Sequence, residues 1–309
     1  MATGPVALSC GEPAGIGPEI AVRAWDSLRD DVPFVWLGDP AHLPPGAACQ
    51  VIAATDEAID VSRTAMPVLP VPFAAPATAG RLDAVNAAGV ITAIERGVAL
   101  TRSGACRALC TAPIHKKALQ DGAGFAYPGH TEYLAALDGG ADVVMMLASD
   151  QLRVVPATIH IPLAQVPATL TAALLEQVLR TTHTGLMRDF GIMSPRIAVA
   201  GLNPHAGEGG KMGQEDAALI APVIAKLAAE GMDLRGPLPA DTMFHASARQ
   251  SYDAAVCMYH DQALIPIKTL DFDRGVNVTL GMSFLRTSPD HGTALDIAGK
   301  GLANPTSLI

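Results

Sequence analysis

Short apolar runs alternate with longer segments of helical spacing along most of this chain, and this alternation limits the fold more than any other feature. Such an order of elements predicts an α/β fold with a largely parallel or mixed sheet. The expected strands are residues 6–10, 34–37, 107–111, 143–147, 154–160, 197–200 and 254–258. The clearest expected helices are residues 170–189 and 215–230, where apolar residues recur with helical spacing. Residues 43–80, rich in Pro and Ala, have no clear period and stay unassigned.

Composition narrows the class of protein. A length of 309 residues suggests two domains, and a chain that is 50% hydrophobic and 17% charged can bury a large core. The formal charge of -9 argues against nucleic acid and anionic membrane as partners, so an anionic substrate would need local cations. The N-terminus reads as a first strand rather than a signal peptide, and no run of apolar residues is long enough for a membrane span, so we expect a cytoplasmic protein.

The five cysteines are odd in number and scattered, which does not suggest a disulfide framework. Cys106 and Cys110 could form half of a metal site. Small buried hydrophobic residues on a strand are the better interpretation of the pair.

Three histidines share one topological position. His160 ends an expected strand, His205 follows another in GLNPHAGEGG, and His260 follows a third in MYHDQ. Ligands of open α/β sheets gather at the carboxyl ends of strands, and neutral imidazole is the commonest metal ligand. Three imidazoles would leave a coordination position for substrate, whereas a single loop histidine is most often a surface or capping group.

Glycine-rich turns follow two of the expected strands, in GEPAGIGPEI at 11–20 and NPHAGEGGKMG at 203–213. Backbone N–H groups in such turns can bind an anion at the start of a helix. Neither turn has the spacing of a Rossmann fingerprint or of a Walker A loop, so tight turns between strand and helix explain them equally well.

Polar and charged residues gather after the third histidine. Lys268, Arg274, Asn277 and Arg286 suit a phosphate or carboxylate in an otherwise acidic protein, with solvated surface charge as the alternative. Apolar neighbours make that alternative less fitting for Asn277 and Arg286. Asp241 and Asp261 are carboxylates of the kind that orient metal-bound imidazoles, although Asp241 could instead cap a helix.

A series of motifs runs from Gly11 to Pro305 and as a set resembles one family. In order they are GEPAGIGPEI, TAPIHKKAL, GHTEYL, GLNPHAGEGGKMG, GPLPADT, MYHDQ, DRGVN, LRTS and DHGTALDIAGKG. The set is similar to the 4-hydroxythreonine-4-phosphate dehydrogenases of vitamin B6 synthesis. The last motif is also similar to isocitrate and isopropylmalate dehydrogenases, which share the wider fold and use this region for the cofactor. The resemblance implies two α/β/α lobes with an active-site cleft between them, one of residues 1–128 plus 270–309 on the cofactor side, the other of 129–269 with the metal ligands and dimer interface.

The resemblance also implies roles for individual residues. The metal ligands would be His160, His205 and His260; the substrate contacts His130, Thr131, Lys268, Asn277 and Arg286; the catalytic and supporting groups Lys268, Asp241 and Asp261; and the cofactor contacts His291, Gly292, Thr293, Ala294 and Asp296. The cofactors would be NAD or NADP and one divalent ion per site, Zn, Co, Mn or Mg. The family forms homodimers with shared active sites, so the third histidine of each site would come from the other subunit.

The implied reaction is metal-dependent NAD(P) oxidation of 4-phosphohydroxy-L-threonine at C3, then decarboxylation to 3-amino-2-oxopropyl phosphate, in pyridoxal 5′-phosphate synthesis. One alternative is a paralogue that oxidises 4-phospho-threonate or 4-phospho-erythronate. Another is an acyltransferase of the phosphotransacetylase type, which would need neither the three histidines nor the HGTALDIAGKG segment. A non-catalytic metabolite-binding protein would not explain why both sets of motifs occur together.

The sequence departs from the family pattern at two points. Asp273 stands in DRGVN where the family usually has glycine, close to residues expected to bind a phosphate. The chain ends at Ile309, soon after ANP, where family members usually continue through another helix, which puts the C-terminal packing and part of the cofactor wall in doubt.

Overall fold

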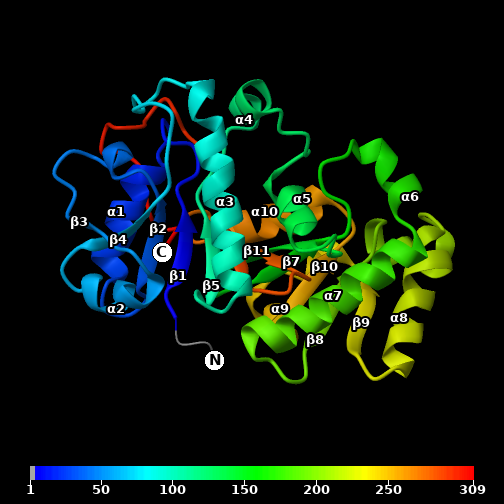
Figure 1. The fold of residues 1–309 in the computed structure, drawn as a ribbon. Coiled ribbons are helices and arrows are strands. Elements are labelled where there is room, and N and C mark those ends of the chain that lie inside the picture. Colours follow the sequence, from blue (N-terminus) through cyan, green and yellow to red (C-terminus); the bar gives the residue numbers. More distant parts are fainter. Residues whose placement is uncertain (1–3) are drawn as a thin grey trace. The chain divides into compact units, whose positions relative to one another are not determined.

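The computed structural model of the protein describes residues 4–309 and divides the chain into two compact units. Unit 1 comprises Met1–Ala141 with Met282–Ile309, and unit 2 comprises Asp142–Gly281. From sequence we placed the boundaries at 128/129 and 269/270. Both units are built of strands and helices, as the expected α/β class requires (Figure 1).

Unit 1 holds a parallel sheet in the strand order β3-β4-β2-β1-β5-β12. Its strands are β1 (Val6–Ser9), β2 (Phe34–Gly38), β3 (Cys49–Val51), β4 (Met66–Pro70), β5 (Ala108–Thr111) and β12 (Arg286–Pro289). Its helices are α1 (Gly17–Leu28), α2 (Ala58–Val61), α3 (Ala87–Arg102), α4 (Lys116–Ala123) and α5 (His130–Leu137). The unassigned stretch 43–80 thus supplies β3, α2 and β4.

Helix α3 covers one face of this sheet and packs on β1, β2 and β5. Its Gly97 lies so close to Leu37 and Leu109 that an added Cβ would come within 2.7 Å of the Leu109 side chain. Side chains alternate between the faces of a strand, so Phe34 and Cys110 point to the opposite face. There they line a cavity of 140 Å³ together with residues of α1. Both faces of the sheet are therefore covered, which explains the apolar runs read from the sequence.

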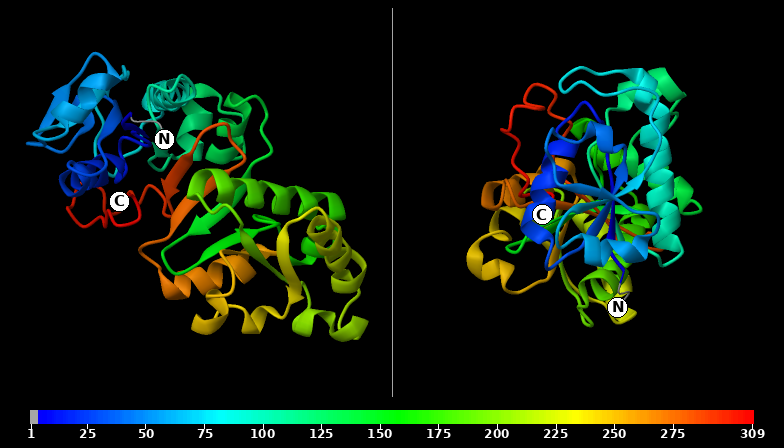
Figure 2. Two further views of the ribbon diagram at one scale, coloured as in Figure 1. Left: turned by 90° about the horizontal axis from the view of Figure 1, so that it is seen from below. Right: turned by 60° about the vertical axis from the view of Figure 1, so that its left-hand side comes forward.

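Unit 2 holds a mixed sheet in the order β11-β6-β7-β10-β8-β9, antiparallel at β11, β6 and β7 and parallel beyond. Its strands are β6 (Val144–Ala148), β7 (Arg153–Pro156), β8 (Arg196–Ala200), β9 (Asp233–Leu238), β10 (Ala254–Cys257) and β11 (Val276–Leu280). Its helices are α6 (Val166–Thr169), α7 (Ala172–Phe190), α8 (Ala221–Ala229), α9 (Ala246–Arg249) and α10 (His260–Leu270). Figure 2 shows α7 and α10 on opposite faces of this sheet.

Helix α7 illustrates how sequence signals set an element of unit 2. The Thr171 hydroxyl accepts a hydrogen bond from the Leu174 N–H (3.1 Å) and so caps the N-terminus. Gly191 ends the helix in the left-handed region at φ 68°. The buried face between them carries Leu175, Val178, Leu179, Thr182, Gly185 and Leu186. This spacing of three and four residues is the reason the helix was predictable.

Two expected elements differ from the structure. The strand expected at 154–160 ends at Pro156, so His160 lies in the loop beyond it; a proline has no N–H for the ladder. The helix expected at 215–230 is divided into a π-helical turn, Asp216–Ile220, and α8. Pro222, which has no N–H to bond the carbonyl four residues earlier, explains the widened turn before it.

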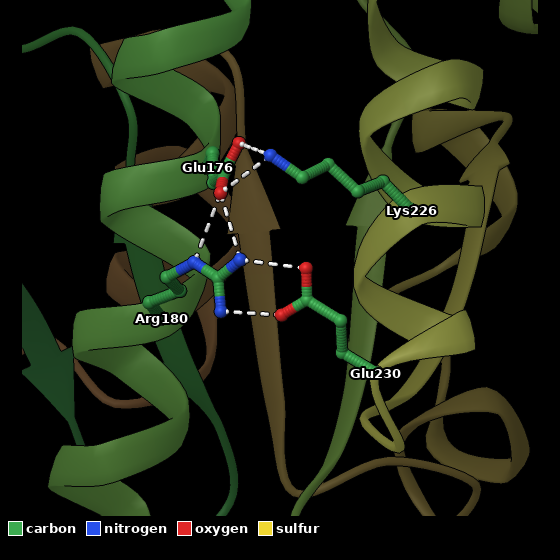
Figure 3. Close-up of polar contacts among 4 residues, drawn as sticks. All are labelled: Glu176, Arg180, Lys226 and Glu230. Atoms are coloured by element: carbon green, nitrogen blue, oxygen red, sulfur yellow. Dashed lines mark hydrogen bonds and ion pairs between the residues drawn. The ribbon is translucent and has the colours of Figure 1, made fainter.

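Helices α7 and α8 are joined at the surface by four charged side chains (Figure 3). Glu176 accepts hydrogen bonds from Lys226 (2.8 Å) and from Arg180 (2.7 Å). Arg180 also pairs with Glu230 at 2.7 Å. These contacts lower the pKa of both carboxyl groups, that of Glu176 chiefly through the bond from Lys226 and that of Glu230 through the bond from Arg180.

No helix in residues 4–309 is both long enough and apolar enough to pass through a lipid bilayer.

Candidate functional site

Two of the three predicted metal ligands lie together in unit 2. The His160 and His260 rings have centroids 5.6 Å apart and line one cavity of 290 Å³, along with Tyr259 and Asp261. The loop after β7 is tied to the end of β10, because the Thr158 hydroxyl donates to the Met258 carbonyl at 2.8 Å. Pairing of the parallel strands β7 and β10 therefore brings the two imidazoles into one pocket.

The carboxylate of Asp261 determines which nitrogen of the His260 ring carries the hydrogen. The distance from His260 Nδ1 to Asp261 Oδ1 is 2.7 Å, and because a carboxylate accepts, Nδ1 carries the hydrogen. In the neutral imidazole this leaves the lone pair of Nε2 for another partner. The contact is of the kind expected where a carboxylate orients a metal-binding histidine.

His205 lies in a left-handed turn rather than in the His160 pocket. Residues 205–209 all have positive φ, among them His205 at 54°, Ala206 at 51° and Glu208 at 41°. The turn follows β8 and leaves His205 exposed. Among the residues that the structure describes, no three His, Cys, Asp or Glu side chains are grouped as a metal site within one chain. One chain therefore presents two imidazoles in a pocket and a third on an exposed turn.

The remaining predicted groups of unit 2 have different settings. Asp241 is exposed in a short 3-10 turn whose N-cap is Pro239, so the alternative expectation that Asp241 caps a helix is wrong. Lys268 is half-buried on α10, with its ammonium 5.4 Å from the centroid of the Phe272 ring. Asp273, the departure from the family pattern, is exposed.

Unit 1 contains a buried cation at the start of β12. Arg286 is 2% exposed and donates to the Thr111 hydroxyl of β5 at 2.6 Å. Burial lowers its pKa to about 10. His130 is the first residue of α5, and Thr131 follows it, half-buried. Burial, and then the charge of Arg286, hold the pKa of His130 well below its ordinary value, so that imidazole is neutral beside a guanidinium.

His130, Asn277 and His291, all predicted site residues, each have a buried polar atom with no hydrogen-bond partner among the described residues. These atoms are His130 Nε2, Asn277 Oδ1 and His291 Nε2. Buried polar atoms in folded proteins are nearly always bonded, and an exception calls for an explanation such as a ligand. A polar ligand bound beside these three atoms would supply the missing hydrogen bonds.

The predicted cofactor segment packs against the glycine-rich turn after β1. The Ile16 N–H donates to the Thr293 carbonyl at 3.0 Å. A Cβ on Gly15 would come within 2.8 Å of the same oxygen, so this approach requires glycine. Of the other predicted residues, His291 donates from Nδ1 to the Gly292 carbonyl at 3.0 Å, Ala294 adopts a positive φ of 43°, and Asp296 is exposed.

A cavity of 390 Å³ lies beside this turn, entirely within unit 1. Its walls are mostly apolar and include Pro13, Pro18, Leu43, Pro44 and Pro45. Among the described residues that line it, Glu19 is the one acid and His42 the one imidazole, and there is neither lysine nor arginine. Glu19 accepts from the Gly299 N–H at 3.2 Å, and His42 donates from Nε2 to the Ala75 carbonyl at 3.1 Å.

Sequence reasoning missed the residues that hold these elements in place. Asp216, 1% exposed, accepts from the N–H groups of Leu202 (2.8 Å) and Asn203 (3.2 Å) ahead of the left-handed turn. Two further missed residues, Gln262 and Glu19, lie within the motifs MYHDQ and GEPAGIGPEI. Their positions beside candidate site residues were the sequence signal that could have identified them. No sequence spacing points to His42.

The chain is similar to known proteins over nearly its whole length. Residues 31–309 match the family described as "Pyridoxal phosphate biosynthetic protein PdxA". A 4-hydroxythreonine-4-phosphate dehydrogenase of Ruegeria sp. is 66% identical over 304 residues, 98% of this chain and 93% of the relative. A protein of the same name from Roseobacter denitrificans is also 66% identical, over 309 residues, 100% of this chain and 95% of the relative. A crystal structure of a Klebsiella pneumoniae protein of that name matches with a TM-score of 0.89 and 37% identity, covering 99% of this chain and 96% of that one.

Proposed function

The chain belongs to the pyridoxal phosphate biosynthetic protein PdxA family, and from that premise we propose that it oxidises 4-phosphohydroxy-L-threonine at C3. It is an oxidoreductase that acts on a CH–OH group in vitamin B6 synthesis, as a 4-hydroxythreonine-4-phosphate dehydrogenase. Family membership and the high identity of these relatives set aside the acyltransferase and the non-catalytic binding protein. A related phosphorylated hydroxy-acid, 4-phospho-threonate or 4-phospho-erythronate, is the alternative substrate to test.

We propose that a divalent ion is held by His160, His260 and a third imidazole. The supporting observation is the pocket with two imidazoles, in which Asp261 leaves His260 Nε2 free to bind a metal. Imidazole ligands favour a transition ion such as Zn²⁺, Co²⁺ or Mn²⁺ over Mg²⁺. When bound, the ion supplies a Lewis acid for negative charge that develops on oxygen.

We propose that the third imidazole is His205 of another copy in a homodimer. Within one chain His205 is on an exposed turn and outside the two-imidazole pocket, a placement suited to a ligand delivered to a second chain. Each active site would then be shared by two subunits.

We propose that the polar groups of the substrate bind to His130, Thr131, Lys268, Asn277 and Arg286. A guanidinium has a planar fork of donors that suits phosphate or carboxylate. A buried cation such as Arg286 gains an anionic partner without further loss of hydration. The buried atom Asn277 Oδ1 can accept from a hydroxyl or ammonium group, and His130 Nε2 can donate or accept according to the tautomer of its ring.

We assign proton handling to Lys268, with Asp241 and Asp261 as supporting carboxylates. Oxidation at C3 removes the hydroxyl proton, and a nicotinamide cofactor, when bound, would supply the acceptor for the hydride from C3. Loss of CO2 then leaves the electron pair of the C2–carboxylate bond to the new carbonyl, and C2 takes up a proton to give 3-amino-2-oxopropyl phosphate. A phosphate contact is the other role proposed for Lys268, and the variant Lys268→Arg separates the two. Arginine at this position keeps the positive charge that a phosphate contact needs, but it holds its proton at every working pH and so cannot act as a base.

We propose that residues 291–294 and Asp296 bind the nicotinamide cofactor, with the 390 Å³ cavity beside them receiving its adenosine end. Proline-rich walls suit a flat heteroaromatic ring, and the carboxylate of Glu19 suits ribose hydroxyls. A 2′-phosphate would meet that carboxylate in a cavity whose described lining has no lysine or arginine, so we propose NAD rather than NADP.

The five free thiols accord with the cytoplasm as the proposed compartment.

The test is formation of reduced cofactor from 4-phosphohydroxy-L-threonine, with NAD and NADP in parallel, before and after exhaustive chelation. We expect turnover with NAD, its loss on chelation and its return with Zn²⁺, Co²⁺ or Mn²⁺. Full turnover after chelation would overturn the metal proposal. Faster turnover of 4-phospho-threonate or 4-phospho-erythronate would reassign the substrate, and preference for NADP would overturn the assignment of the cavity.

A further inference from the structure

The side chain of Gln262 connects the ends of two strands in unit 2. Its Oε1 accepts from the Met258 N–H at 2.7 Å, and its Nε2 donates to the Gly201 carbonyl at 2.7 Å. Met258 is the first residue after β10 and Gly201 the first after β8, and these strands are parallel neighbours. The half-buried side-chain amide of Gln262 therefore joins the ends of β8 and β10. These strands lead into the segments that carry His205 and His260.

Both segments begin at this connection. Gly201 opens the loop that leads to His205, and His260 lies on the same first turn of α10 as Gln262. The buried Asp216 fixes the next residues of the loop through the Leu202 and Asn203 N–H groups. The base of the His205 loop is thus held from one side by Gln262 and from the other by Asp216.

An amide is the side chain that this position requires. It must accept from an N–H and donate to a carbonyl at the same time, which a carboxylate, an ammonium or an apolar group cannot do. Loss of the amide would leave the Gly201 carbonyl and the Met258 N–H to find other partners, and the loop would no longer be fixed relative to α10.

We propose that Gln262 is a positioning residue for the metal, one that fixes the His205 loop relative to His260 within each subunit. The inference rests on the proposed function, in which these histidines are ligands. Ligands from two subunits are not joined by a short stretch of chain, so each must be presented by a rigid support. Groups that hydrogen-bond to metal ligands typically contribute about 10- to 100-fold to metal affinity, and we expect an effect of this order from Gln262, which fixes the backbone that carries the ligands.

The test is Co²⁺ binding to the metal-free protein, measured by absorbance with a competing chelator. Gln262→Met keeps the approximate length of the side chain and removes both hydrogen bonds, and Gln250→Met makes the same change at an exposed glutamine of unit 2. We expect Gln262→Met to weaken Co²⁺ binding by about 10- to 100-fold and Gln250→Met to bind like wild type. Wild-type affinity in Gln262→Met would overturn the proposal.

A second control separates positioning from general stability. Thr171→Ala removes the N-cap of α7, a helix that carries neither His205 nor His260, and should lower stability without changing Co²⁺ affinity. An equal loss of affinity in Thr171→Ala would overturn the proposal. If Gln262→Met does not fold, Gln262→Asn, too short to span both partners, takes its place with the same expected loss. A wild-type protein that binds no Co²⁺ would refute the proposed metal site itself, whereas a loss confined to the Gln262 variants supports both.

Discussion

Arg286 holds its positive charge where water can scarcely reach it, with 2% of its surface exposed. We expect Arg286→Ala to lower kcat/KM on the phosphorylated substrate by about ten- to a hundredfold, since a charge-assisted contact contributes about 1.5–3 kcal/mol. Arg286→Lys, which keeps the charge without the fork, should recover part of the loss. Equal losses on an unphosphorylated analogue would assign Arg286 to the carboxylate or to folding. No loss on either would remove it from the site.

His130 should remain neutral in the folded protein, because burial and then Arg286 lower its pKa well below 6.5. Below the ordinary pKa, the unfolded chain binds a proton that the folded chain does not, so the free energy of unfolding falls as pH decreases from about 6.5. An NMR titration should find no protonation of His130 near pH 6. The variant His130→Asn should show a shallower decline of stability with acid, and an unchanged slope would contradict the argument.

Helices and strands with a regular sequence pattern could be predicted, whereas those without such a pattern could not. Helix α7 has a cap, a stop and an apolar face in its sequence, so it was predicted within two residues of its bounds. Strands β3, β4, β9, β11 and β12 were missed. Strands β3 and β9 lie at the edges of their sheets and are exposed or half-buried, so their sequences carry no apolar run. The pairing of His160 with His260 followed from strand order, which motifs do not reveal. The separation of His205 from them follows from a left-handed turn whose positive φ values include non-glycine residues, and sequence does not signal these.

The charged contacts between α7 and α8 should contribute stability that depends on salt and acid (Figure 3). We expect Arg180→Met to lower the Tm at neutral pH in dilute buffer, and the difference to shrink in high salt, where exposed charges are screened. The lowered pKa values of Glu176 and Glu230 set the direction in which this stabilisation changes with pH. Their contribution is complete above the ordinary carboxyl pKa and is lost as pH falls through the lowered values.

The exposed Arg63, which forms no ion pair among residues 4–309, offers a matched charge change. Arg63→Met should leave the Tm near wild type. If it lowered the Tm as much as Arg180→Met, net charge rather than the contacts would be responsible.

For the whole molecule, the placement of the histidines determines which subunits can complement each other. His160 and His260 of one chain share a pocket, whereas His205 is proposed to serve another chain. Mixed dimers of His205→Ala with His260→Ala would contain one site with all three imidazoles. We expect such mixtures, unfolded and refolded together, to regain up to half of the wild-type activity per mixed dimer, measured as NADH formation.

The pair His160→Ala with His260→Ala is the matched negative control, because every mixed dimer would lack one ligand at each site. Activity in both mixtures, or in neither, would contradict a site shared in this way. A fully active monomer, shown by sedimentation, would exclude it.

The left-handed turn at 205–209 has a consequence for how this protein tolerates heat. Ala206 and Glu208 adopt φ of 51° and 41°, a conformation that costs a residue with a Cβ about 1 kcal/mol and costs glycine little. The sequence therefore retains strain in a loop that glycine would relieve, at the place where rigid presentation of His205 is required. A search for thermostable variants should recover glycine at these two positions, and those variants should survive heating better while binding metal less tightly.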